Sequence, residues 1–129
     1  MTCGLWLAPR DLVAVLFDGA GRSRSLRVAL SDDARWGLAH RLAAVGADLV
    51  VDEALLKADP VAFVARRAGV TVWVAGAPLV ASLRSAAGLA HRGARPSAAM
   101  LARLPGIPWL REQLRRLDDA GDTRQLKFL

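Results

Sequence analysis

The arrangement of short apolar segments in the first half of the chain constrains the fold more than any other feature of the sequence. Three of them lie within the first thirty residues, at 4–8, 12–17 and 23–30. Between the last two, residues 18–21 read Asp-Gly-Ala-Gly, and these residue types tolerate the positive φ of a tight hairpin. The middle segment is apolar at every position, which is typical of a strand covered on both faces, whereas the third alternates. This pattern predicts an antiparallel meander of three strands.

The rest of the chain alternates between helical and strand patterns. Helices are expected at 31–45, 59–68, 79–90, 97–104 and 109–117, and strands at 48–52 and 70–75. The tail at 122–129 fits either a short strand or a docked arm. Together these elements predict an α/β fold with a five-stranded mixed sheet and helices on both faces. We expect a single domain of residues 1–129, with a C-terminal helix and tail at 105–129.

The composition excludes several kinds of site. Cys3 is the single cysteine, which excludes an intramolecular disulfide and a cysteine-based zinc site, and the two histidines are too few for a multi-histidine centre. We therefore expect no metal and no cofactor. No apolar run approaches the roughly 18 residues of a membrane span, and the N-terminus does not resemble a signal peptide. The expectation is a cytoplasmic protein without a membrane partner.

The positive charge is concentrated towards the C-terminus. The protein carries a net charge of +6, of which residues 1–83 contribute +1 and residues 84–129 contribute +5. A basic third beside a near-neutral body is typical of a surface that binds nucleic acid or an acidic partner. However, 16 of the 18 basic residues are arginine and alanine is abundant, a bias that a GC-rich genome would give to any protein. Both explanations remain open at this point.

Several short motifs follow one another in an order that points to a family. They are Gly-Leu-Trp at 4–6, Asp-Gly-Ala-Gly-Arg at 18–22, Val-Val-Asp-Glu-Ala at 50–54, Ala-Pro at 77–78, and Ala-Arg-Pro-Ser-Ala at 94–98 before Leu-Ala-Arg-Leu at 101–104. In this order and spacing, the chain resembles the RNase H-like superfamily. Within it, the chain is most similar to the RuvC-like N-terminal domain of insertion-sequence transposases that carry a DEDD carboxylate set. The resemblance covers roughly residues 3–104 and implies an RNase H-like sheet.

The resemblance also implies a two-metal nuclease centre, but most of its carboxylates are missing here. Enzymes of that family hold two divalent ions with clustered carboxylates. The first carboxylate position falls on Trp6 and the last two fall on Ala94 and Ser97, so Glu53 is the one match. Asp52 precedes Glu53 and, if the strand continues, points to the opposite face. We therefore expect no catalytic residue and no activity; Glu53 fits either a relic metal ligand or an ordinary polar residue at the end of a strand.

The basic residues are the candidates for binding. On the resemblance and the charge together, the sequence predicts a catalytically inactive module that binds DNA or RNA, within a mobile element or another DNA-handling complex. The predicted nucleic-acid-binding residues are Arg22, Arg24, Arg84, Arg92, Arg95, Arg111, Arg115 and Arg116. His91 lies beside Arg92 in a segment that fits phosphate binding as well as an ordinary solvated loop. Trp109, next to an arginine-rich helix, is the aromatic residue best placed to face a partner.

Two alternatives remain open. The apolar content and the final helix also suit a protein–protein assembly module, either a homodimer or a component of a pilus or secretion system, because related actin-like assembly proteins begin with a similar meander. The second alternative is a residual metal-dependent nuclease that uses Glu53. The first would show no salt-dependent affinity for nucleic acid. The second would need magnesium or manganese and would lose its activity in Glu53→Ala.

Overall fold

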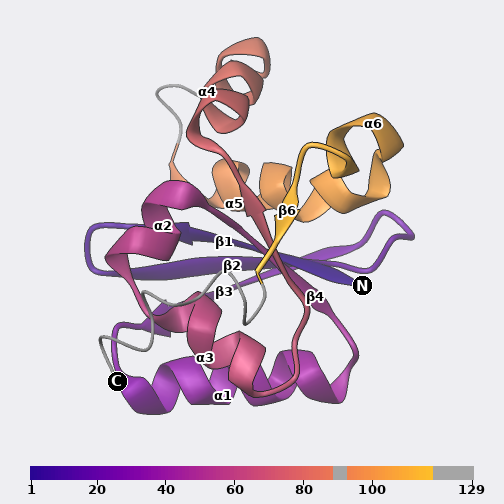
Figure 1. Ribbon diagram of the computed structural model, residues 1–129. Helices are drawn as coiled ribbons and strands as arrows, with labels where there is room; N and C mark the ends of the chain where they lie inside the picture. The colour runs from indigo at the N-terminus through magenta and orange to yellow at the C-terminus, as the bar shows by residue number, and fades with distance from the viewer. Residues whose placement is uncertain (89–92, 118–129) are drawn as a thin grey trace.

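A six-stranded mixed sheet lies at the centre of the protein, in a computed structural model that describes residues 1–88 and 93–117 (Figure 1). The strands are β1 (Thr2–Leu7), β2 (Asp11–Phe17), β3 (Ser23–Ala29), β4 (Asp48–Asp52), β5 (Val72–Ala75) and β6 (Arg115–Arg116). Their order across the sheet is β3-β2-β1-β4-β5-β6. The first three strands form the expected antiparallel meander, and β4 and β5 run parallel to β1. The predicted α/β class with a mixed sheet is confirmed.

The prediction of five strands is wrong, because β6 pairs antiparallel with the outer edge of β5. The helix expected at 109–117 is limited to α6 (Pro108–Arg111), after which the chain turns and extends along that edge. The backbone N–H of Leu117 donates to the carbonyl of Val72 at 2.9 Å and completes the attachment. An unpaired strand edge leaves backbone N–H and C=O groups without partners. Pairing with β5 satisfies these groups, so this segment is extended although its sequence pattern suits a helix.

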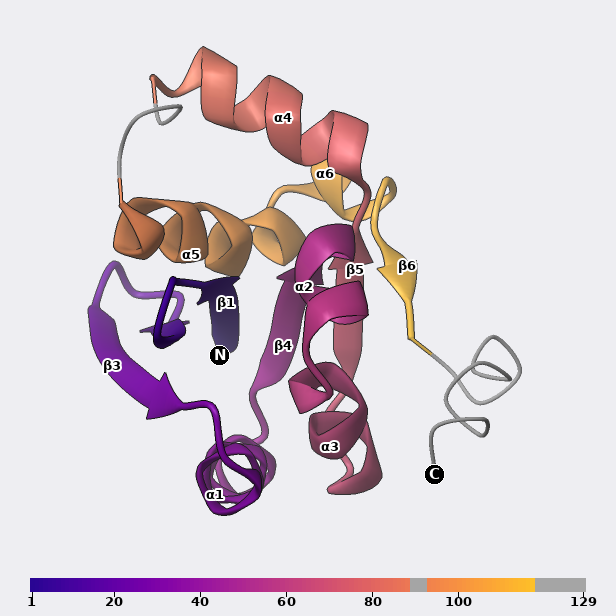
Figure 2. The ribbon, with the colours of Figure 1, turned by 90° about the vertical axis from the view of Figure 1, so that its left-hand side faces the viewer.

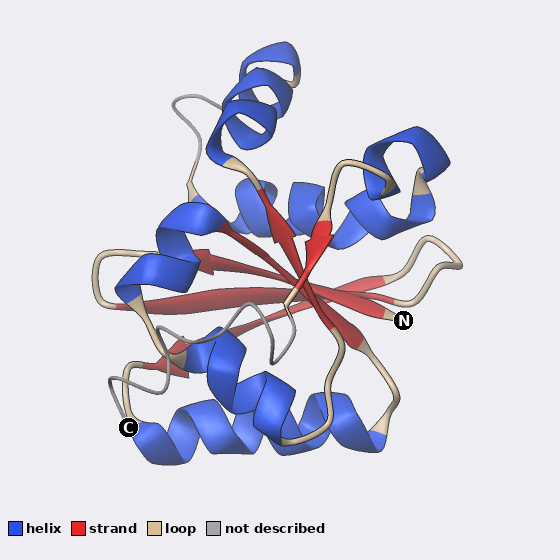
Figure 3. Ribbon diagram, viewed as in Figure 1, coloured by secondary structure: helices blue, strands red, loops and turns tan. Residues whose placement is uncertain are grey.

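Two layers of helices cover the sheet (Figures 2 and 3). On one face lie α1 (Asp32–Ala44), α2 (Glu53–Ala58) and α3 (Val61–Arg67). On the other lie α4 (Ala77–Ala86), α5 (Ala94–Arg103), the 3₁₀ turn η1 (Leu104–Gly106) and α6. In the view of Figure 1, α1 and α3 lie below the sheet and α4, α5 and α6 above it. None of the helices within the described residues has the length and apolar character needed to cross a bilayer.

Each layer has its own apolar core, because neighbouring residues of a strand point to opposite faces of the sheet. Cys3, Leu5, Leu49 and Val51 belong to the larger cluster, which packs against α1 to α3. Val50 belongs to the second cluster, which packs against α4, α5 and α6. The buried strand β4 therefore contributes to both cores.

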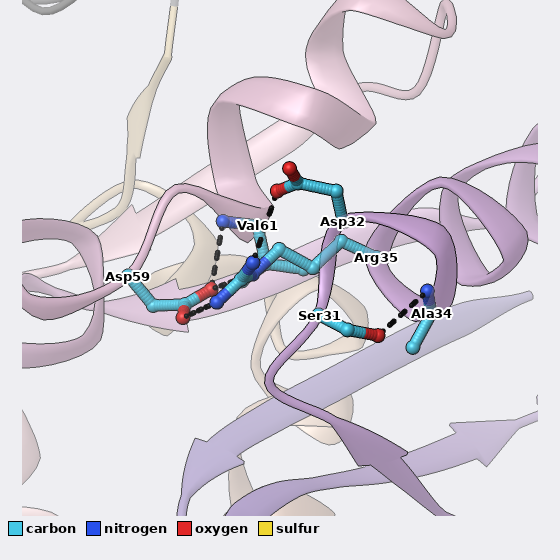
Figure 4. A network of polar contacts seen from close by, with 6 residues as sticks. All are labelled: Ser31, Asp32, Ala34, Arg35, Asp59 and Val61. Atoms are coloured by element: carbon cyan, nitrogen blue, oxygen red, sulfur yellow. Dashed lines mark hydrogen bonds and ion pairs between the residues drawn. The ribbon is translucent and has the colours of Figure 1, made fainter.

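Polar contacts fix the ends of the helices on the α1 side (Figure 4). Ser31 caps α1, and its side chain accepts a hydrogen bond from the N–H of Ala34 at 3.2 Å. Arg35 of α1 donates from Nε and from a terminal nitrogen to the two oxygens of Asp59, at 3.0 and 2.8 Å. Asp59 also accepts from the N–H of Val61 and so fixes the start of α3. The helix expected from Asp59 thus begins after Pro60, with Asp59 as the link to α1.

Candidate functional site

The carboxyl ends of β1 and β4 lie side by side, at the position where the resemblance implies the metal centre. Gly4 of β1 pairs with Val50 of β4. Trp6 and Asp52 each follow these residues by two positions, so their side chains point to the same face of the sheet, the one covered by α5. The acidic residue nearest to the Trp6 position in the register is therefore Asp52 rather than Glu53.

Asp52 acts as a helix cap in this position. Its side chain accepts a hydrogen bond from the N–H of Leu55 at 2.8 Å and so begins α2, a short helix that the strand pattern had not indicated. The residue is 8% exposed, and burial raises the pKa of its carboxyl, while the charge of Arg84 acts in the opposite direction. An aspartate between an apolar strand and an amphipathic segment is a sequence signal for an N-cap, and it could have revealed this role.

Trp6 lies on the neighbouring strand, on the same face of the sheet as Asp52. The guanidinium carbon of Arg84, on α4, lies 4.9 Å from the centre of the Trp6 ring. An arginine stacked on an indole is a cation–π contact. The position to which the resemblance assigns a metal-bridging carboxylate thus holds an apolar ring, with a positive charge against it.

Glu53 points elsewhere. It is the first residue of α2, and its Oε1 accepts a hydrogen bond from Nε of Arg115 on β6 at 3.0 Å. Arg115 is one of the predicted nucleic-acid-binding residues, and this ion pair neutralises part of its charge. This contact joins α2 to β6 through two residues that are 62 positions apart in the sequence.

The start of α5 carries the two remaining positions of the carboxylate set, Ala94 and Ser97. Ser97 is fully buried, and its hydroxyl has no hydrogen-bond partner among the residues that the structure describes. Small side chains are needed here because α5 lies directly on β1. A Cβ atom on Gly4 would collide with the carbonyl of Ala98 and lie 2.6 Å from the N–H nitrogen of Ala102. Across residues 1–88 and 93–117, no three His, Cys, Asp or Glu side chains converge as metal ligands would.

The predicted arginines separate into two groups. Arg84, Arg95, Arg111, Arg115 and Arg116 lie on α4, α5, α6 and β6. Arg22 and Arg24 lie on the other side of the sheet, where they line a cavity against α1. Arg92 and His91 fall outside the described residues, as does the tail at 122–129.

We call residues 76–88 and 93–117, which form α4, α5, η1, α6 and β6, the basic layer. These residues carry six arginines and one acidic residue, Glu112, whereas residues 31–71, which form α1 to α3 and β4, carry five basic and six acidic residues. Sequence reasoning did not select the sixth arginine of the basic layer, Arg103, which lies on α5 with its guanidinium carbon 5.5 Å from the ring centre of Phe17. Arg111 makes a similar contact with Trp73, at 5.4 Å.

Trp109 is the most exposed large apolar residue that the structure describes, at 63%. It borders a groove of about 550 Å³ between α4 and α6, together with Leu79 and Leu83. The other tryptophans have partners: Trp36 stacks on His40, and the indole N–H of Trp73 donates to Asp48 at 3.0 Å. Of the four tryptophans, Trp109 is the one with an exposed side chain.

Cys3 has no features of a nucleophile. It is fully buried in β1, and burial raises the pKa of its thiol to about 12. A thiol with such a pKa stays protonated at neutral pH and behaves as a small apolar side chain.

No protein-family model matches the chain, and no curated protein matches it.

Proposed function

We propose that this protein is a catalytically inactive RNase H-like domain that binds nucleic acid through its basic layer. The order of the first five strands supports this proposal, because a three-stranded meander followed by two parallel strands is the arrangement that the resemblance implies. The sixth strand extends that arrangement at its outer edge without changing it.

We infer the absence of nuclease activity from the contacts that side chains make near the carboxyl ends of β1 and β4. Trp6 supplies no oxygen ligand and stacks with Arg84. Asp52 is used as the cap of α2, and Glu53 is paired with Arg115. A two-metal centre needs several carboxylates to offset the repulsion between the ions. Here Asp52 and Glu53 already make contacts that stabilise the fold. The nearby guanidinium of Arg84 adds a positive charge that would repel a metal ion.

The charge of the basic layer is the observation that carries the proposal. Six arginines against one acidic residue give its described residues an excess of five positive charges, whereas residues 31–71 have an excess of one negative charge. An arginine patch on one side of a domain attracts the phosphate backbone and displaces its counterions. Arg95 and Arg103 are both exposed on α5, and Arg111 and Arg116 are exposed on the elements that follow it.

Fluorescence anisotropy with single-stranded and duplex oligonucleotides tests this proposal. An interface that neutralises about four phosphates predicts that log Kobs falls with log[salt] with a slope of roughly −3 to −4. Arg95→Ala and Arg103→Ala should each weaken binding for all sequences and reduce the slope by about one. Arg67→Ala, an exposed arginine of α3 on the other layer, is the matched control and should change neither.

The proposal would be overturned by a lack of affinity for any oligonucleotide at low salt, or by an equal loss in the Arg67→Ala control. The same samples, incubated with magnesium or manganese, should leave the oligonucleotides intact. Cleavage that disappears in Glu53→Ala would instead favour the nuclease alternative.

A protein–protein assembly module is the second candidate, and the groove between α4 and α6 is the observation that favours it. The exposed indole of Trp109 beside Leu79 and Leu83 is the kind of aromatic anchor that protein interfaces use. Light scattering separates the two candidates. A stable dimer that Trp109→Ala dissociates, with no salt-dependent affinity for oligonucleotides, would replace the nucleic-acid proposal with this one.

A further inference from the structure

A second cavity lies on the opposite side of the sheet from the basic layer. It has a volume of about 630 Å³ and is lined by residues of the β2–β3 hairpin and of the C-terminal half of α1. Cavities of a few hundred to about a thousand Å³ are the usual size for sites that hold small molecules. Arg22 and Arg24, which sequence reasoning assigned to nucleic acid, line this cavity and so are not part of the basic layer.

The floor of the cavity is aliphatic. Leu16 and Leu26 contribute from the hairpin, and Leu38 and Leu42 contribute from the facing side of α1. The two leucines of α1 are buried, whereas those of the hairpin are partly open. Aliphatic side chains offer neither hydrogen bonds for the edge of a base nor a ring for stacking, which are the contacts that nucleic-acid sites use. They are suited to an alkyl chain.

Apolar residues continue from the floor to the protein surface. Met1 and Val45 also line the cavity and are 53% and 54% exposed, which makes them two of the most exposed large apolar residues that the structure describes. An apolar surface that continues from a cavity to its mouth costs solvation free energy in the empty protein, and this surface would be covered by a bound apolar group.

The rim of the cavity is positively charged. Arg22, Arg24 and Arg41 are all exposed and line it, and none of the three forms an ion pair within residues 1–88 and 93–117. The acidic residue among the lining residues is Asp18. Its Oδ1 accepts hydrogen bonds from the N–H groups of Ala20 and Arg22, at 2.8 and 3.2 Å, and this holds the carboxylate in the hairpin turn. The rim thus has a net positive charge above an aliphatic floor.

We propose that this cavity binds a free single-chain amphiphile with an anionic headgroup, such as a medium-chain carboxylate. The alkyl chain would lie on the partly exposed Leu16 and Leu26 and against Met1 and Val45, and the headgroup would be bound by the arginines of the rim. Arginine binds carboxylates with two parallel hydrogen bonds, which suits an exposed site where a single ion pair has little strength. This site is independent of the nucleic-acid interface, since the two lie on opposite faces of the sheet.

Isothermal titration calorimetry with sodium decanoate, below the concentration at which it forms micelles, tests the proposal. Saturable 1:1 binding is expected, with an affinity that rises three- to fourfold for each methylene between octanoate and decanoate. Decanol, which has the chain without the charge, should bind at least tenfold more weakly. The double variant Arg24→Glu/Arg41→Glu should also lose at least tenfold, whereas the control Arg67→Glu on α3 should bind decanoate like the unmodified protein.

Four results would overturn the proposal: no binding of decanoate, equal binding of decanol and decanoate, an equal effect of Arg67→Glu, or binding to anionic phospholipid vesicles without binding of the free carboxylate. The exposed arginines can be exchanged without disturbing the core, and an unchanged melting temperature verifies this. As a second readout, Leu26→Asp should abolish binding by placing a charge on the floor. Oligonucleotide affinity should be the same in the presence and absence of decanoate, so that each site is tested separately.

Discussion

At the scale of single residues, the contact between β1 and α5 depends on Gly4, which has no side chain. Gly4→Ala would drive a Cβ into the backbone of Ala98 and Ala102, which cannot move aside as a flexible side chain could. We expect a loss of about 2–4 kcal/mol in the free energy of unfolding, as for other overpacked cores. Urea denaturation followed by far-UV circular dichroism measures it.

Gly37 provides the matched control for this substitution. It lies on the exposed side of α1, and a Cβ there would meet no atom within 4 Å. Gly37→Ala should therefore stabilise the protein by about 0.5–1 kcal/mol, since alanine is the better helix former. If both substitutions had the same effect, the close approach of α5 to β1 would be contradicted.

Asp52 gives a prediction about pH at the same scale. Folding raises the pKa of its carboxyl above the ordinary value of 3.8 because the group is buried. Its contribution to stability is therefore complete below the ordinary aspartate pKa and is lost as the pH rises through the higher folded pKa. Asp52→Asn keeps an oxygen acceptor for the N–H of Leu55 but cannot ionise. Relative to the unmodified protein, it should gain stability between pH 3 and pH 7, as measured by urea denaturation at both values.

Asp52→Ala is the control that separates the charge from the cap. It removes the hydrogen bond to Leu55 as well as the charge, and the loss of a helix N-cap costs about 1 kcal/mol. At pH 3, where the carboxyl is neutral, Asp52→Ala should be less stable than Asp52→Asn. A stability difference between Asp52→Asn and the unmodified protein that does not change with pH would contradict the raised pKa.

At the scale of elements, the pair Arg35–Asp59 fastens α1 to the start of α3 (Figure 4). The Asp59 side chain is 5% exposed, and that of Arg35 is 12% exposed. Replacing one partner of a buried pair leaves the other charge without compensation, and Asp59→Asn should cost about 3 kcal/mol in the free energy of unfolding. Asp11→Asn breaks the exposed pair with Arg27 and should cost less than about 1 kcal/mol. Urea denaturation measures both changes. If Asp59→Asn and Asp11→Asn lowered the free energy of unfolding equally, the larger contribution of the α1–α3 pair would be contradicted.

The sequence predicted the elements where local patterns and tertiary packing agree. The strand at 48–52 has the predicted bounds, and α1 lies within the predicted range of 31–45, with Ser31 as its cap and Gly46 following it at a φ of +66°. At 109–117 the leucine spacing suits a helix, but the leucines do not share one face. Leu110 and Leu114 pack with α4 and α5, whereas Leu117 reaches the core beneath α1 to α3. The local sequence pattern does not show that the chain passes from one face of the sheet to the other between Leu114 and Leu117.

The same distinction applies to the candidate site. That β1 holds no acidic residue could be read from the sequence, because it depends on residue types alone. The sequence alone could not show that Asp52 rather than Glu53 accompanies Trp6, because this depends on the register between β1 and β4, in which Gly4 pairs with Val50. Likewise, a sum of charges could not separate Arg22 and Arg24 from the other arginines, because the sheet that lies between them is formed by distant segments.

At the scale of the whole molecule, the sheet separates two layers that differ in both charge and packing. The basic layer includes α4, in which Val80 is the one buried residue, whereas α5 beneath it buries Ser97, Ala98, Leu101 and Ala102. In the view of Figure 2, α4 lies outermost, above α5. A helix with so little buried surface opens locally at a lower free energy than the strands it covers. The layer proposed to meet nucleic acid is thus also the one that includes the most weakly packed helix.

Native-state hydrogen exchange tests this difference. Without a ligand, the amides of α4 should exchange with a lower opening free energy than those of β1 and β4, whose exchange should require global unfolding. If the basic layer is the interface, a bound oligonucleotide should slow exchange in α4 and α6 and leave α1 and α3 unchanged, because binding stabilises the closed form where contacts are made. If the oligonucleotide instead slowed exchange in α1, the interface would have to lie on the opposite face of the sheet. Decanoate provides the reverse comparison: it should slow exchange in the β2–β3 hairpin and the last turn of α1 without affecting α4.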